Sequence, residues 1–221
     1  MNYILHSMSR ILVTRPEHDP LTRHLSRWNS KIIEVAKSKG HAVTDLHKEK
    51  ANKKEFEGRI KKLNPALVLL NGHGDESCVT GHDNEILVEK GKNEMLLKNK
   101  ITYAVSCSSA KKLGSVCADS NTAYIGYDEP FALNLDRQFL SDPLHDMRAK
   151  NFLEPSNRVA CSLLKGHTAK EASDNSKKAF KENIIELLTR KGNDPDAHDD
   201  AKSLFWNMSH QVCLGKEDAK L

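Results

Sequence analysis

Aromatic residues are scarce in this chain of 221 residues: Phe, Trp and Tyr together make up 5 % of the sequence. Hydrophobic residues of all kinds reach 38 %, so we expect a modest core built from aliphatic side chains. No apolar run approaches the roughly 20 residues that a membrane-spanning helix requires, and we expect no membrane partner. Glycine-rich phosphate-binding motifs of the GxGxxG and GxxxxGK[ST] types are also missing, so nothing in the sequence indicates a nucleotide site.

Paired cysteine spacings are absent as well, and the number of cysteines is odd. The first residues, MNYILHSMSRILV, interrupt their short apolar runs with His and Arg and do not resemble a signal peptide. Both features predict reduced thiols in a cytoplasmic protein. Three of the cysteines fall on predicted apolar helical faces, where we expect them to be buried in the core: Cys117, Cys161 and Cys213.

The charge has little bias of either sign. Lys and Arg number 34 against 30 Asp and Glu, which gives a net charge of +4. The densest basic run, Lys48 to Lys62, contains three glutamates and reads as a solvated helical face. We therefore expect no nucleic-acid partner.

Strands and helices alternate along the first part of the chain. The segments LTRHLSRWNSKIIEVAKSKG and Lys53–Leu63 read as helices, and residues 77–88 read as a β-hairpin. This order predicts a three-layer α/β/α sandwich with a mostly parallel sheet. The expected strands cover residues 10–14, 41–46, 66–70, 101–106 and 122–127, with short helices at 94–98 and from Ser108 or Ser109 to Val116.

The last third of the chain reads as helical. One apolar stripe runs from Ala172 to Leu187 and a second from Ala197 to Val212, with Gly192-Asn193 between them and Asp194-Pro195 at the start of the second. We expect these helices to pack on the sheet, so that residues 1–221 form one domain, with a sheet core at about 10–128 and a helical part at about 131–213.

Two buried strands end in residues that can carry chemistry. LVLLNGHG places His73 after one strand, and ITYAVSC places Cys107 after the next parallel strand. Because ligands of open α/β sheets bind beyond the carboxyl ends of the strands, we expect both side chains at one edge of the sheet. A thiol before a helix and beside an imidazole is activated as a nucleophile, and the N–H groups of Gly74 and Cys107 can form an oxyanion hole.

These motifs resemble the caspase-like cysteine peptidases of clan CD, the group of caspases, metacaspases, legumain, gingipains, separase and CHAT-domain proteins. The resemblance covers roughly residues 10–128, and SLLKGHTAKEAS with its long helix is similar to CHAT domains. It implies an endopeptidase with Cys107 as nucleophile, His73 as general acid and base and Gly74 as oxyanion donor. It also implies a protein or peptide substrate, no cofactor, and control by self-cleavage, a regulatory protein partner, a homodimer or a ligand.

The residue preceding the scissile bond is a further expectation. Val105 stands where several relatives carry a polar group of the specificity pocket. Asp19 and Asp128 are the acidic candidates for that pocket, and an acidic pocket selects Arg or Lys. If Arg15 lines it instead, the preference reverses to Asp or Glu. We favour the basic preference.

Other interpretations remain open at this point. Alone, His73 reads as a histidine that stabilises a turn, and Cys107 as a buried thiol. His73, Cys78 and His82 lie within ten residues, but their spacing fits no standard zinc finger, and we expect no metal. The alternative to an enzyme is a non-catalytic α/β scaffold or sensor, with the C-terminal helices as its interface.

Overall fold

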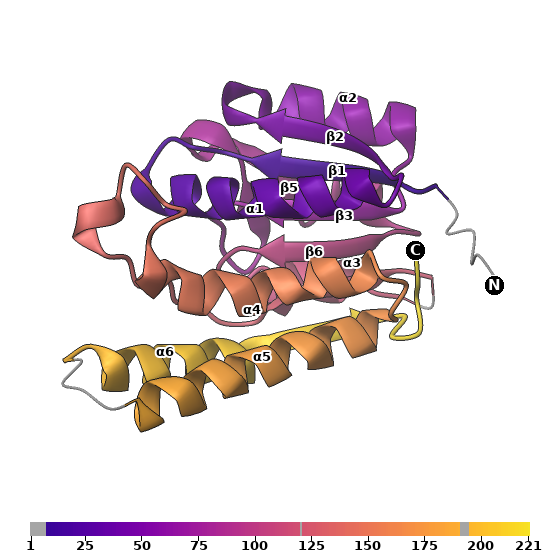
Figure 1. Ribbon diagram of the computed structural model, residues 1–221. Helices are drawn as coiled ribbons and strands as arrows, with labels where there is room; N and C mark the ends of the chain where they lie inside the picture. Colours follow the sequence, from indigo (N-terminus) through magenta and orange to yellow (C-terminus); the bar gives the residue numbers. More distant parts are fainter. Residues whose placement is uncertain (1–7, 120, 191–194) are drawn as a thin grey trace.

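The central feature of the structure, a computed structural model that describes residues 8–119, 121–190 and 195–221, is a six-stranded sheet. Its strands lie in the order β2-β1-β3-β6-β7-β8, and all are parallel except the edge strand β8 (Figure 1). A separate hairpin, β4-β5, follows β3 in the chain. The strands are β1 (Arg10–Arg15), β2 (Ala42–His47), β3 (Leu67–Asn71), β4 (Cys78–Thr80), β5 (Ile86–Glu89), β6 (Ile101–Val105), β7 (Ala123–Tyr127) and β8 (Gln211–Gly215).

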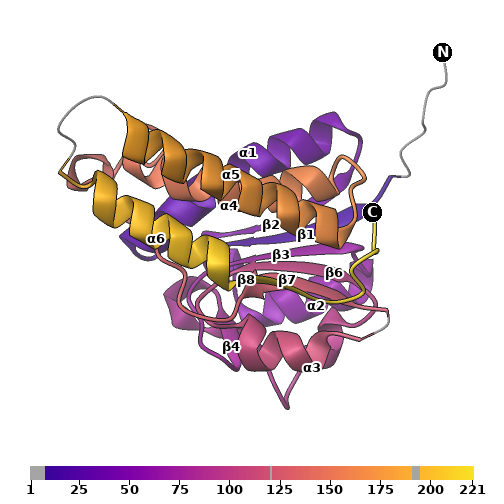
Figure 2. The same ribbon diagram turned by 90° about the horizontal axis from the view of Figure 1, so that it is seen from below.

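Helices cover both faces of this sheet. The helices α1 (Pro20–Ser38), α4 (Met147–Leu163), α5 (Ala169–Thr189) and α6 (Ala197–His210) lie on one side, and α2 (Lys53–Leu63) and α3 (Ser115–Cys117) on the other (Figure 2). Alternate strand residues face the two sides, as Ile11 and Leu12 do, so each face builds its own aliphatic core. The α/β/α sandwich with a mostly parallel sheet and a helical C-terminal part is therefore confirmed.

Local sequence explains where the first helix begins. Asp19 is its N-cap: the Asp19 carboxylate accepts a hydrogen bond from the Thr22 N–H at 2.8 Å, and the Asp19 N–H donates to the Thr22 hydroxyl at 3.1 Å. Pro20 occupies the first helical turn, where its missing N–H costs nothing. The apolar stripe that contains Trp28 and Ile32 is buried against the sheet. These features fix the loop that joins β1 to α1.

The predicted second C-terminal helix ends earlier than expected. It stops at His210, and β8 begins at once and pairs antiparallel with β7. Val212 and Leu214 pack against one core cluster and Cys213 against the other, the two-residue alternation of a strand. The helical stripe that included Val212 was wrong at this point, since a short apolar segment fits either period. The expected break at Gly192-Asn193 and the Asp194 start signal lie outside the described residues.

Smaller differences concern the short helices and the cysteines. Glu94–Leu97 forms a 3-10 helix, and Ala110–Gly114 forms a π-helical turn that leads into α3. Cys117 is buried as expected, whereas Cys161 and Cys213 are only partly buried at the margin of the core.

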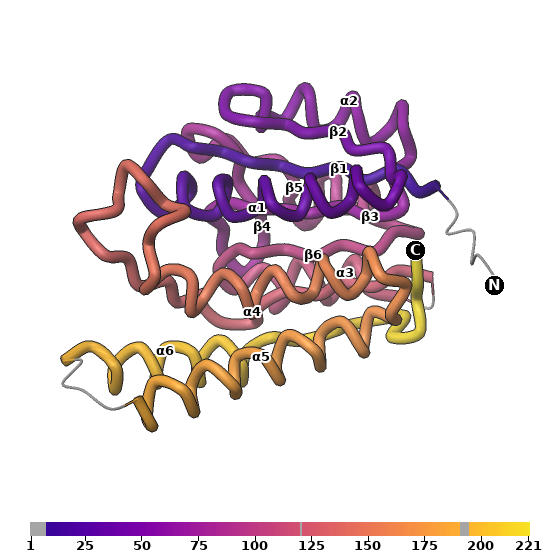
Figure 3. The backbone as a smooth tube through the Cα atoms, in the orientation of Figure 1, coloured from indigo at the N-terminus to yellow at the C-terminus, as the bar shows by residue number. Residues whose placement is uncertain are grey.

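The connection between β7 and α4, residues 128–146, projects beyond the carboxyl ends of the parallel strands (salmon, left side of Figure 3). It follows the strand next to β6, so it passes close to the sheet edge that carries the candidate site. Within the described part of the chain, no helix is both long and apolar enough to cross a membrane.

Candidate active site

His73 and Cys107 occupy equivalent places after two neighbouring strands. β3 and β6 pair in parallel, and the last residues of the two strands, Asn71 and Val105, are register partners. His73 and Cys107 each lie two residues beyond that pair. Both line one pocket of about 170 Å³ at the carboxyl edge of the sheet. The residues that line this pocket are Leu21, Leu25, Gly72, His73, Val105, Ser106, Cys107, Phe131 and Leu133.

The backbone around His73 is held by the hairpin and by β6. The His73 carbonyl accepts hydrogen bonds from the Thr80 N–H at 2.9 Å and from the Ser106 hydroxyl at 3.2 Å. Gly72 has φ +156°, and a Cβ there would lie 2.2 Å from the Thr80 carbonyl oxygen. The glycine before His73 is therefore required by close contact with β4, not by chain flexibility.

The Gly74 N–H points away from its partner segment. Gly74 and Val79 form an antiparallel bridge whose hydrogen bonds are made by the neighbouring N–H groups of Asp75 and Thr80. In such a pair, the N–H groups of the two facing residues are directed outward. The Gly74 N–H is therefore not used in the pairing with β4, which is a requirement for an oxyanion donor, although Gly74 itself does not line the pocket.

The chain turns sharply after Cys107. Ser108 has φ +54°, a left-handed conformation that is uncommon for residues other than glycine, and its N–H donates to the Glu129 carbonyl at 3.2 Å. The expected serine cap is not made: Ser109 has helical backbone angles and not the extended angles of an N-cap, and its hydroxyl accepts a hydrogen bond from the Tyr124 hydroxyl. The helical segment begins at Ala110, so Cys107 lies in the turn before it and is half-buried.

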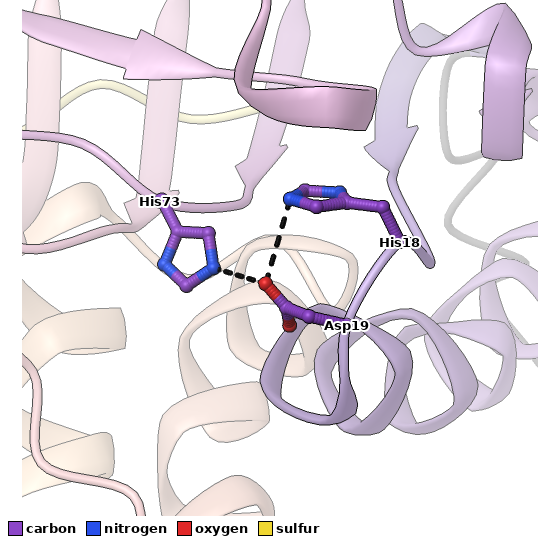
Figure 4. Close-up of side chains that lie close together, drawn as sticks. All are labelled: His18, Asp19 and His73. Carbon is purple, nitrogen blue, oxygen red and sulfur yellow. Dashed lines mark hydrogen bonds and ion pairs between the residues drawn. The ribbon is translucent and has the colours of Figure 1, made fainter.

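A carboxylate orients the His73 ring. Asp19 Oδ2 lies 2.5 Å from His73 Nε2 (Figure 4). Oδ1 of the same carboxylate caps α1, so the carboxylate is fixed on one side by the helix and on the other by the imidazole. An ionised carboxylate only accepts hydrogen bonds, hence Nε2 carries the proton and Nδ1 is the basic nitrogen of the neutral ring.

Asp19 is stabilised in its ionised form. Its partial burial opposes ionisation and is the largest single influence, but the Thr22 N–H and the His73 ring together outweigh it. The net result is a pKa of Asp19 below its ordinary value of 3.8. The partner of His73 is therefore an anion throughout the neutral pH range.

His18, Asp19 and His73 also form the one group with metal-ligand chemistry found among the described residues, with ligand atoms within 4.8 Å of one another. Zinc bonds to nitrogen and oxygen are about 2.0–2.2 Å long, so two ligand atoms on one ion normally stand about 3 Å apart or more. The 2.5 Å between Asp19 and His73 fits a hydrogen bond and leaves no room for an ion between them. We assign this contact to a hydrogen bond between Asp19 and His73.

A second carboxylate fixes the loop that carries Asp19. Glu17 is almost fully buried and accepts hydrogen bonds from His47 Nε2 at 2.7 Å and from the Ser26 hydroxyl at 2.8 Å. Burial opposes its ionisation most strongly, yet the hydrogen bonds from His47 and Ser26 lower the pKa of Glu17 below 4.5. The loop between β1 and α1 is thus anchored to β2 through His47 and to α1 through Ser26.

The other four cysteines have raised pKa values, which disfavour their thiolate forms. Burial raises the pKa of Cys117 to about 12 and that of Cys213 to about 11, and it is also the main cause of the raised pKa values of Cys78 and Cys161. Since the thiolate is the nucleophile, these four cysteines are poor candidates for covalent chemistry.

The residues expected to set specificity are not gathered in one place. Val105 lines the pocket beside Cys107. Asp19 bonds to His73, and Asp128 pairs with His210 Nδ1 at 2.9 Å; neither lines the pocket. Arg15 is buried and makes paired hydrogen bonds to Asp45, so it is also engaged elsewhere.

Sequence reasoning missed the contact between Asp19 and His73 and the pocket residues Phe131 and Leu133. Asp19-Pro20 can be read as a helix start, but nothing in the local pattern shows that the cap also faces an imidazole 54 residues away. Phe131 and Leu133 belong to a loop without regular period. A scan against models of known protein families matches none, and a search of curated proteins finds no relative.

Proposed function

We propose that this protein is a cysteine endopeptidase of the caspase-like clan CD group, with Cys107 as nucleophile and His73 as general acid and base. The observation that carries the proposal is the shared pocket at the ends of β3 and β6, where a partly buried cysteine and a carboxylate-bound imidazole occupy equivalent positions. The β4-β5 hairpin between the two motifs agrees with the same group. Five free cysteines agree with a reducing, cytoplasmic environment.

In the acylation step, the Cys107 sulfur attacks the carbonyl carbon of the substrate peptide bond. The proton of the thiol passes to His73, and the oxyanion that forms is bound by the N–H groups of Gly74 and Cys107. Each such donor is worth about 3 kcal/mol in the transition state. The C–N bond then breaks, His73 returns its proton to the departing amine, and a thioester on Cys107 remains.

In the deacylation step, His73 takes a proton from water, and the hydroxide attacks the thioester carbonyl. The C–S bond breaks, the acid product leaves and the thiol is restored by the proton held on His73. Asp19 acts as a positioning residue. It keeps the proton of the neutral ring on Nε2 and stabilises the imidazolium that forms in both steps.

The direct test uses a pool of diverse peptides and analysis of cleavage products by mass spectrometry. Wild type should cleave, and Cys107→Ala and His73→Ala should lose cleavage by at least about 10³-fold, the scale of losing a member of such a unit. Cys161→Ala is the matched control, because it removes a partly exposed thiol outside the pocket. Cleavage that survives in Cys107→Ala, or that disappears in Cys161→Ala, would refute Cys107 as nucleophile.

A second candidate is a non-catalytic scaffold, and exposed apolar side chains on the C-terminal helices favour it. Ile185 and Leu188 on α5 are 51 % and 52 % exposed, and Phe205 on α6 is 59 % exposed. Exposed apolar groups of this kind mark interaction surfaces when they cluster. Native mass spectrometry of wild type and Phe205→Ser tests this role. Assembly that depends on Phe205, in a protein without Cys107-dependent cleavage, would favour the scaffold.

A further inference from the structure

The pocket beside Cys107 has apolar walls from three parts of the chain. Leu21 and Leu25 lie one turn apart at the start of α1, Val105 is the last residue of β6, and Phe131 and Leu133 come from the loop after β7. These side chains meet because α1, β6 and the loop after β7 share the carboxyl edge of the sheet. The other lining residues are Gly72, His73, Ser106 and Cys107, which include the two reacting side chains of the proposed site.

Charged side chains near this edge are already engaged. Asp19 is hydrogen-bonded to His73, and Asp128 is paired with His210. Arg15 is bound to Asp45 through two hydrogen bonds of 2.9 and 2.6 Å. None of these three charged residues, which could select a charged substrate, lines the pocket. A charged group placed here would lose water, and no charged side chain outside the catalytic group lines the pocket to compensate for that loss, which is unfavourable.

We propose that this pocket binds an apolar side chain, of the size of Leu, Met or Phe, on the residue whose carbonyl Cys107 attacks (the P1 residue). This inference rests on the proposed function and replaces the expected preference for Arg or Lys. The volume of about 170 Å³ is close to that of an engineered apolar cavity of about 150 Å³ that takes up benzene. A branched aliphatic chain or one aromatic ring fits such a space.

The expected selectivity follows from the apolar walls. In a hydrophobic pocket one methylene group changes the specificity constant about 10- to 200-fold. The value of kcat/KM should therefore be at least about tenfold higher for Leu, Met or Phe at P1 than for Ala. Peptides with Arg or Asp at P1 should fall below Ala, because they also require a charge to be desolvated.

The experiment measures kcat/KM for six peptides that differ only at P1: Leu, Met, Phe, Ala, Arg and Asp. Leu21→Asp adds a carboxylate at the mouth of the pocket, where Leu21 is 39 % exposed and the first turn of a helix accepts an acid. This variant should raise the Arg-to-Leu ratio by more than about tenfold. Leu144→Asp is the matched control, since Leu144 is 40 % exposed and lies outside the pocket, and it should leave the ratio unchanged.

The outcomes separate this inference from the proposed function. Cys107-dependent cleavage that is fastest after Arg or Asp, or equally fast after all six residues, would overturn the apolar pocket and leave the peptidase standing. An unchanged ratio in Leu21→Asp would also overturn it. Absence of cleavage of every peptide, with no Cys107-dependent labelling by a peptide chloromethyl ketone carrying Leu at P1, would overturn both.

Discussion

The exchange of Asp19 for Asn separates two roles of one carboxylate. Asn is as good an N-cap as Asp, so the hydrogen bond to the Thr22 N–H is kept. The charge that faces His73 Nε2 at 2.5 Å is lost. Hydrogen bonds to charged groups contribute about 1.5–3 kcal/mol and neutral ones about 0.5–1.5 kcal/mol. With the Asn oxygen kept on Thr22, the Asn NH2 group faces His73 Nε2 and holds the ring as the wrong tautomer, with its proton on Nδ1. The whole charged hydrogen bond of about 1.5–3 kcal/mol is then lost, or about 10- to 150-fold in kcat/KM.

The assay pairs steady-state kinetics on a cleaved peptide with thermal melting. Asp19→Asn loses the charged hydrogen bond to His73 as well as the favourable charge at the helix N-terminus, so its melting temperature should fall by several degrees. Thr22→Ala is the control: it removes the hydroxyl that bonds to the Asp19 N–H and to Asp19 Oδ1, but leaves Asp19 Oδ2 and its contact with His73. It should melt earlier with kcat/KM within about twofold of wild type.

The pH dependence of stability checks the same contact. The pKa of Asp19 in the folded protein lies below 3.8, so the stability from its ionised form is present above that pH and is lost as the pH falls through the lowered pKa. The difference in melting temperature between wild type and Asp19→Asn should shrink as the pH falls below about 4, because Asp19 then becomes protonated. A kcat/KM for Asp19→Asn within twofold of wild type would refute the positioning role.

Two further predictions concern the oxyanion donor and the thiols. Gly74→Ala places a Cβ 2.5 Å from the Cys78 carbonyl, so the backbone must shift, and kcat should fall about 10²-fold or more in a peptide-cleavage assay. Gly58→Ala, in open space on α2, should leave kcat unchanged and raise the melting temperature slightly, and equal kcat in both variants would contradict the assignment. Iodoacetamide at pH 8 should label Cys107 first by peptide mapping, since a pKa of about 12 leaves Cys117 roughly one part in ten thousand ionised; faster labelling of Cys117 would contradict this.

Much of the fold could be read from the sequence because strong periodic patterns mark its elements. The helix at Lys53–Leu63 was predicted with the bounds that the structure has, and the β4-β5 hairpin, residues 78–89, differs from the predicted range of 77–88 by one residue at each end. The strand β8 was missed, because five residues after a helix carry too short a pattern to separate a strand from another helical turn. Its assignment depends on a free edge of β7, which no local pattern reveals.

The candidate site, like the fold, could be predicted only in part from the sequence. His73 and Cys107 could be proposed together because each follows a buried strand, and parallel neighbours share an edge. The roles of Asp19 and Asp128 could not be read, since both depend on which residues the fold brings opposite them: His73 for the first and His210 for the second. An acidic residue in a loop has many partners available, and only packing decides among them.

The edge strand β8 has a consequence for any shortened version of this protein. Residues 211–215 complete the sheet by covering the backbone of β7, which otherwise ends the row of hydrogen-bonded strands. Deleting them would leave the N–H and C=O groups on that side of β7 without partners, and uncovered strands of this kind join to other chains. A truncated protein would therefore tend to self-associate through Ala123–Tyr127, and the sheet and the C-terminal segment have to be kept together in any fragment made for study.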